Sequence, residues 1–169
     1  MILSTARLTL RPFTPADAPF ILELLNQPSW IENIGDRGVR TEAAAVGYIE
    51  NGPLASYHQH GFGLWCVERT KDRIPVGMCG ILQRDYLDSP DIGFAYLERY
   101  QGQGFGTEAA EATIAYARET LHLDRMAAVV SPDNAASIRI LRRLGMRYTE
   151  PILMPGDTEP IALYRLPGA

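Results

Sequence analysis

Three glycines at alternate positions separate a predicted strand from a predicted helix. Residues 91–97 (DIGFAYL) are typical of a strand, and residues 107–121 carry apolar side chains at helical spacing. Gly102, Gly104 and Gly106 lie between these two segments. Because glycine has no Cβ, this connection can adopt positive φ angles and can approach a neighbouring group closely. The strand–loop–helix order predicts a mixed α/β domain.

Alternating or β-rich segments are expected to form a sheet of about seven strands. Residues 62–68 and 74–84 are joined by the polar run RTKDR, which indicates a hairpin. No internal repeat or long linker divides the chain, so we expect one α/β (α+β) domain over residues 1–169. In chain order the expected strands are 7–13, 62–68, 74–84, 91–97, 126–130, 148–153 and 161–166.

Helix-start signals precede three more segments. Thr14 and Thr41 each supply a capping hydroxyl before apolar positions, and Asn134 precedes a helix that Gly145 is expected to end. Residues 29–40 show no clean periodicity. We expect that segment to be a loop or a short helix on the surface.

Composition and charge exclude several classes of protein. With 169 residues, 46% hydrophobic and 21% charged, the chain is typical of a soluble globular domain rather than a disordered protein. Its net charge of -4 provides no basic footprint for nucleic acid. No apolar run is long enough to cross a bilayer and the first residues do not resemble a signal peptide, so we expect a cytoplasmic protein without a membrane partner. Cys66 and Cys79 lie in apolar runs and predict two buried thiols, with no disulfide and no metal site.

The glycine loop is a candidate phosphate site. Its backbone N–H groups would add to the partial positive charge at the start of the following helix, so residues 101–107 could cradle a pyrophosphate. The alternative is a tight turn that binds no ligand. The segment lacks the Gly-Lys-Ser/Thr ending of a P-loop and the Gly-x-Gly-x-x-Gly pattern of dinucleotide-binding folds. Neither nucleotide hydrolysis nor hydride transfer is therefore favoured.

The loop and two further motifs resemble one enzyme superfamily. Gln101-x-x-Gly104-x-Gly106 is similar to the acetyl-CoA loop of the GNAT acetyltransferases. Two segments resemble the branch that acetylates N-terminal amines of ribosomal proteins, namely RLTLR at 7–11 with Asp17 and the loop with its helix start at 100–109. A third, NAAS at 134–137 followed by LGM at 144–146, resembles the superfamily's second cofactor segment, and all three occur in the family's order.

The resemblance implies an acetyl-CoA site in a mixed, mostly antiparallel sheet flanked by helices. Two neighbouring strands would splay apart there to admit the pantetheine arm, which would pair with the 94–96 backbone. Amides of the glycine loop would hold the pyrophosphate, and Asn134 would bond the pantetheine from the far side. The implied acetyl-CoA-binding residues are Phe94, Ala95, Tyr96, Gln101, Gly102, Gly104, Phe105, Gly106, Thr107, Asn134 and Ser137.

Acetyl transfer to an amine needs a deprotonated nitrogen and help for the departing thiolate. Ser137 lies one helical turn after Asn134, so its hydroxyl could donate to the sulfur; the alternative is a bond to a carbonyl of its own helix. Many members of the superfamily use a tyrosine at the position held here by Leu141. Asp85 and Asp91 are the candidate bases, with solvated turn carboxylates as the alternative.

The acceptor cleft of the family lies near its first helices. We therefore expect Trp30, Asn33, Asp36 and Arg37 to bind the acceptor, although a large aromatic such as Trp30 is also typical of a core. The predicted function is acetyl-CoA-dependent transfer of an acetyl group to a primary amine, either a protein N-terminal amine or a small molecule. A CoA-binding sensor without turnover and a nucleotide-binding enzyme are the alternatives. The resemblance is compatible with a homodimer.

Overall fold

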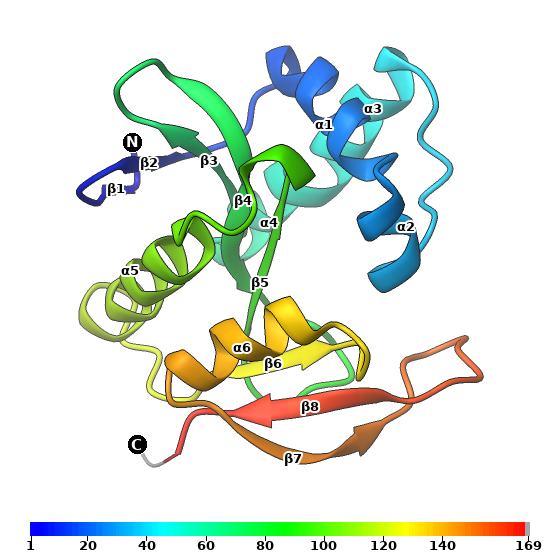
Figure 1. Cartoon of the computed structure of the whole chain (residues 1–169), viewed down its shortest axis with the longest axis vertical. Coiled ribbons are helices and arrows are strands. Elements are labelled where there is room, and N and C mark those ends of the chain that lie inside the picture. The colour runs from blue at the N-terminus through cyan, green and yellow to red at the C-terminus, as the bar shows by residue number, and fades with distance from the viewer. Residues whose placement is uncertain (168–169) are drawn as a thin grey trace.

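Eight strands form one mixed, mostly antiparallel sheet in the computed structural model, which describes residues 1–167 (Figure 1). Their spatial order is β1-β2-β3-β4-β5-β6-β8-β7, and only β5 and β6 run parallel. The predicted fold class is confirmed. The strands are β1 (Leu3–Ser4), β2 (Leu8–Arg11), β3 (Leu64–Arg69), β4 (Ile74–Leu82), β5 (Asp91–Tyr96), β6 (Ala127–Val130), β7 (Arg147–Ile152) and β8 (Ile161–Arg165).

Strand β1 is the one strand that the sequence pattern did not predict. It has two residues and pairs Leu3 with Leu10 and Ser4 with Thr9 of β2. Two residues are too few to show an alternating pattern, so pairing with β2 defines this strand. The predicted hairpin of β3 and β4 is confirmed, with Arg69 paired to Ile74 across the turn.

Helices cover both faces of the sheet. Because side chains alternate along a strand, Trp65 and Val67 of β3 join the core under α5, whereas Cys66 joins the core under α1 and α3. Figure 1 shows α5 on the opposite side of the central strands from α1 and α3, with α6 lying over β6 and β8. The helices are α1 (Ala18–Leu25), α2 (Pro28–Asn33), α3 (Glu42–Ile49), α4 (Ala55–His60), α5 (Phe105–Glu119) and α6 (Ala135–Arg143).

The segment 29–40 forms a short helix and a mostly exposed loop, as the sequence pattern predicts, but its Trp30 side chain is buried. Its first part completes α2, which begins at Pro28, a residue favoured at the first helical position. The Trp30 side chain is 5% exposed and packs with Phe13, Leu24 and Leu25 in the core under α1 and α3. A single turn and a half of helix carries too few residues to show helical periodicity, which explains the absence of a signal.

The sheet splits between β5 and β6. Asp91 pairs with Ala127 at the start of both strands, and no later residue of β5 pairs with β6. The other edge of β5 pairs with β4 along its whole length, from Asp91 to Tyr96. The last residues of β5 therefore present one backbone edge that no strand covers, which confirms the predicted splay. No helix among residues 1–167 is long and apolar enough to span a membrane.

Candidate functional site

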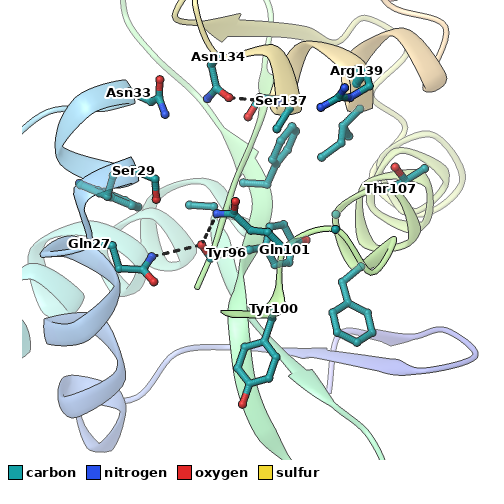
Figure 2. Close-up of a pocket in the computed structure, with 18 of the residues that line it drawn as sticks. Gln27, Ser29, Asn33, Tyr96, Tyr100, Gln101, Thr107, Asn134, Ser137 and Arg139 are labelled. Atoms are coloured by element: carbon teal, nitrogen blue, oxygen red, sulfur yellow. Dashed lines mark hydrogen bonds between the residues drawn. The ribbon is translucent and has the colours of Figure 1, made fainter. Parts of the chain in front are cut away.

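A cavity of about 510 Å³ opens where the sheet splits (Figure 2). Its walls come from the free edge of β5, the glycine loop with the start of α5, α6 along its length, and α2. All residues that the resemblance assigned to acetyl-CoA line this cavity. They are Phe94, Ala95, Tyr96, Gln101, Gly102, Gly104, Phe105, Gly106, Thr107, Asn134 and Ser137.

The carbonyl at the end of β5 accepts two hydrogen bonds from side-chain amides. Gln27 Nε2 donates to Tyr96 O over 3.3 Å, and Gln101 Nε2 donates to the same oxygen over 3.1 Å. Figure 2 shows the two amides converging on this carbonyl from different walls. Gln27 Oε1 also accepts from Glu98 N over 2.7 Å. Side chains thus satisfy this one carbonyl at the end of β5, while the preceding residues of the edge stay uncovered by a strand.

The glycine loop has the conformation that its sequence predicts. Gly102 and Gly104 have φ angles of +77° and +82°, in the left-handed region that favours glycine. Gly104 is also the N-cap of α5, and the first intrahelical bond runs from Glu108 N to Gly104 O. The N–H groups of Phe105, Gly106 and Thr107 therefore have no acceptor within the helix. They form a set of donors at the cavity wall.

Gly106 serves packing rather than backbone conformation. A Cβ at this position would lie 2.7 Å from Ile140 Cδ1 of α6 and 3.4 Å from Tyr96 Cε2. The absence of a side chain lets α5 and α6 approach each other beside the cavity.

The Tyr96 hydroxyl is buried without a hydrogen-bond partner among residues 1–167, and burial raises its pKa well above the usual value.

The start of α5 is tied to the chain between β1 and β2. Glu108 accepts hydrogen bonds from the Thr5 hydroxyl, from Arg7 N at 3.0 Å and from Arg7 Nε at 2.8 Å. Burial alone would raise the pKa of Glu108, but these donors hold it below the usual value. Arg7 also donates to Gln103 O over 3.0 Å and stacks on Phe105. Glu108 thus stabilises the start of α5.

Two arginines of α6 give the cavity a positive wall. Arg139 and Arg143 are spaced four residues apart, so both project from the same face of the helix, and both line the cavity. Arg139 faces Thr107 across the glycine loop in Figure 2. Together with the free N–H groups of α5, they favour a ligand that carries phosphate groups.

The N-terminus of α6 combines a cap with a candidate proton donor. Asn134 Oδ1 accepts from Ser137 N over 3.2 Å, so this side chain caps the helix while its amide nitrogen keeps its donors. The Ser137 hydroxyl makes no hydrogen bond to its own helix in the described chain. Ser137 lines the cavity, and no hydrogen bond within its helix competes with its predicted role as a proton donor.

A second cavity, also of about 510 Å³, is lined by residues of both strands that flank the split, β5 and β6. Leu64, Met78, Ile92 and Leu141 contribute its apolar wall, and Tyr48 contributes a hydroxyl. Several residues line both cavities, so the two spaces meet beside β5 and the start of α6. The shared residues are Trp30, Asn33, Ile34, Phe94, Ala95, Asn134 and Ser137.

Three of the four predicted acceptor residues lie at these cavities. Trp30 and Asn33 of α2 line both, and Arg37 lines the second. Asp36 lines neither, because its carboxylate pairs with Arg40 at 2.6 Å and accepts from Gly38 N. The structure therefore assigns Asp36 a local structural contact and leaves it apart from the site.

The two candidate bases are separated from both cavities. Asp85 lies on an exposed turn, and Asp91 is completely buried at the point where β5 and β6 meet. Arg84 Nε lies 3.2 Å from Asp91 Oδ2, but neither carboxylate oxygen accepts a well-aligned hydrogen bond from residues 1–167. Burial raises the pKa of Asp91 to about 7, and the charge of Arg84 opposes this rise. As placed, neither carboxylate touches an acceptor directly.

Sequence reasoning missed several residues of both cavities. Gln27 follows α1 in a segment without a pattern, and Arg84 and Asp157 come from loops far apart in the chain. Of these residues, Arg139 and Arg143 could have been predicted from the sequence, because their spacing of four places them on one face of α6. Ile140, on the same face, packs near Gly106 of the glycine loop.

The donors and the free edge fit acetyl-CoA. The uncovered backbone of β5 can bond an extended amide-bearing chain, and the α5 N–H groups with Arg139 and Arg143 can bind phosphates. Among residues 1–167, no three His, Cys, Asp or Glu side chains gather as a metal site.

Comparison with known proteins agrees with this geometry. A family model described as acetyltransferase (GNAT) domain matches residues 7–147. YkkB, an uncharacterized protein of Bacillus subtilis, is 33% identical over 107 residues, or 62% of this chain, and the match spans only 61% of YkkB. The ribosomal protein uS5-alanine N-acetyltransferase of Escherichia coli is 31% identical over 98 residues, or 56% of this chain and 50% of that protein.

A solved structure matches nearly the whole chain. The acetyltransferase from Agrobacterium tumefaciens superposes with a TM-score of 0.80 at 29% identity, covering 96% of this chain and 92% of that one. The predicted resemblance, including its link to the ribosomal branch, is therefore confirmed. The chain belongs to the GNAT acetyltransferase family, whose members use acetyl-CoA.

Proposed function

We propose that this GNAT N-acetyltransferase transfers an acetyl group from acetyl-CoA to a primary amine by direct attack of the amine on the thioester. One observation carries the proposal: the two cavities share a boundary at Phe94, Ala95, Asn134 and Ser137. Acetyl-CoA would fill the first cavity, and the acceptor amine would enter through the second. Residues 1–169 would act as one catalytic domain.

The residues of the first cavity bind and orient the co-substrate. Amides of Gly104 to Thr107, with Arg139 and Arg143, would hold the pyrophosphate, and the free edge of β5 would hold the pantetheine arm. The Asn134 amide would donate to that arm while its oxygen caps α6. Acetyl-CoA supplies an acetyl group activated as a thioester. Holding both reactants at the shared boundary lowers the entropic barrier to their reaction.

The transfer requires two proton movements. The C–S bond breaks as the amide C–N bond forms, so the amine loses a proton and the departing thiolate gains one. Ser137 would donate this proton to the sulfur, and its position in the lining of both cavities supports that role. The α-amine of a peptide N-terminus has a pKa of ~8, so it is partly deprotonated at neutral pH and water can serve as its base. This route does not require Asp85 or Asp91 to reach the acceptor.

Calorimetric titration with acetyl-CoA tests the first half of the proposal, with NAD and ATP as controls. We expect selective binding of acetyl-CoA. Release of CoA thiol in the presence of an amine panel tests the second half. Binding with no turnover on any amine would support a CoA-binding sensor instead, and preferential binding of NAD or ATP would overturn the acetyltransferase assignment.

A further inference from the structure

The second cavity carries an uneven set of charges. Its charged side chains are those of Arg37, Arg84 and Asp157, so cations outnumber anions in the wall of a protein whose net charge is -4. An acceptor that is only an amine is a cation in its protonated form, and the Arg37 guanidinium, which has no ion-pair partner among residues 1–167, would repel it. The wall is therefore suited to an acceptor that also carries negative charge.

Arg84 is held in place by contacts that leave one end unused. Its Nη1 donates to the Tyr86 hydroxyl over 2.7 Å, and its Nε lies 3.2 Å from the buried Asp91 carboxylate. Its Nη2 has no hydrogen bond to the described residues. With a side chain that is 27% exposed, Arg84 can offer this nitrogen to a ligand at low cost in side-chain entropy.

Arg37 reaches the same cavity from the other side. It follows α2, it is exposed, and it has no ion pair or hydrogen bond within residues 1–167. Both guanidinium groups act on the Tyr48 phenol, which lines the cavity too: burial raises the pKa of Tyr48, and the charges of Arg37 and Arg84 oppose this rise. Both arginines thus line the same cavity as Tyr48.

We propose that the acceptor is a small amine that also carries a carboxylate or another anionic group, which Arg37 and Arg84 bind. Asp157 would attract the ammonium form of the acceptor before it loses its proton. A free amino acid has this combination of charges. The inference rests on the proposed function, because it assigns the second cavity to the acceptor. Guanidinium groups suit it because they bind carboxylates through paired N–H donors.

Matched acceptors test the charge requirement. Free amino acids and their amides are compared at pH 8 by the release of CoA thiol, after titration has shown that acetyl-CoA binds. We expect kcat/KM to be roughly tenfold or more higher for the acid, the size of one charge-assisted hydrogen bond. The amine of the amide is the less basic of the two, so amine deprotonation favours the amide and cannot produce this preference.

Variants locate the effect in the cavity. Arg37→Gln should reduce the acid-to-amide ratio of kcat/KM, and Arg37→Lys should retain part of it. Arg118→Gln is the matched control, because Arg118 is exposed on α5 and lines neither cavity. Equal rates for acids and amides, or an unchanged ratio in Arg37→Gln, would overturn the inference while leaving the acetyltransferase intact.

Two other results are distinguishable from these. A preference for peptides with acidic residues over free amino acids would assign the site to a protein N-terminus and overturn the small-molecule assignment. No turnover on any amine would overturn the proposed function itself, and this inference with it.

Discussion

Single side chains at the start of α6 have two functions at once. Asn134 caps the helix through its oxygen and keeps two amide donors for a ligand, and Ser137 contributes its N–H to that cap while its hydroxyl lines both cavities. The hydrogen bond from Ser137 N to Asn134 Oδ1 also fixes the position of Ser137. Capping and ligand binding therefore depend on the same turn of backbone.

Ser137→Ala separates the proposed acid from the cap, since alanine keeps the N–H that Asn134 accepts. We expect kcat to fall roughly 10²-fold, the lower range for general acid catalysis, with little change in acetyl-CoA affinity. Steady-state CoA release and calorimetry provide the two readouts. Ser137→Thr, which keeps a hydroxyl, is the control. Full activity in the alanine variant would restrict Ser137 to a structural role.

Among the elements, the glycine loop and α5 form the proposed pyrophosphate site. Two left-handed glycines turn the chain, and Gly104 then caps α5 so that three N–H groups at its start face the cavity wall. Glu108 anchors this start of α5 to Thr5 and Arg7 near the N-terminus. The loop is thus positioned by a segment about a hundred residues away.

Gly104→Ala tests the loop at this scale. A Cβ there would lie 3.3 Å from an Arg7 side-chain nitrogen, and the positive φ adds strain, so we expect acetyl-CoA affinity to fall at least tenfold by calorimetry. Gly61→Ala is the matched control, because Gly61 has a φ of +79°, open space around it and no contact with either cavity. An equal loss of affinity in both variants would contradict a specific role for the loop.

Across the whole molecule, the split between β5 and β6 determines where both cavities lie. The strands meet only at Asp91 and Ala127, and that junction buries the Asp91 carboxylate completely. Its pKa of about 7 makes the stability of the fold depend on pH. Between about pH 4 and pH 7 the unfolded chain has lost this proton while the folded chain keeps it. The contribution of Asp91 to the free energy of unfolding therefore falls as the pH rises through this range.

Asp91→Asn should remove this dependence. A difference of one in pKa corresponds to about 1.4 kcal/mol, so ionisation of Asp91 costs the folded state roughly 4 kcal/mol as an upper limit above pH 7. We expect the variant to gain stability relative to the parent protein at pH 8 and less at pH 5. Urea unfolding at both pH values measures the difference, and parallel shifts at the two pH values would refute this account of Asp91.

Local patterns in the sequence predicted much of the fold and the whole glycine loop. The strands, the caps at Thr41 and Asn134 and the left-handed glycines depend on neighbours within a few residues, so their signals lie within short segments. The loop motif was found for the same reason, because a helix start with its preceding glycines is continuous in the chain.

Only the tertiary structure decided which residues share a cavity. Gln27 meets Tyr96 across 69 positions, Arg37 and Arg84 come together from separate loops, and Asp91 is buried because two strands converge on it. Such placements depend on sheet order and on helix packing, which no local pattern contains. The sequence by itself determined the glycine loop and the strand pattern, whereas the packing of distant segments determined the second cavity, since long-range contacts set its walls and charges.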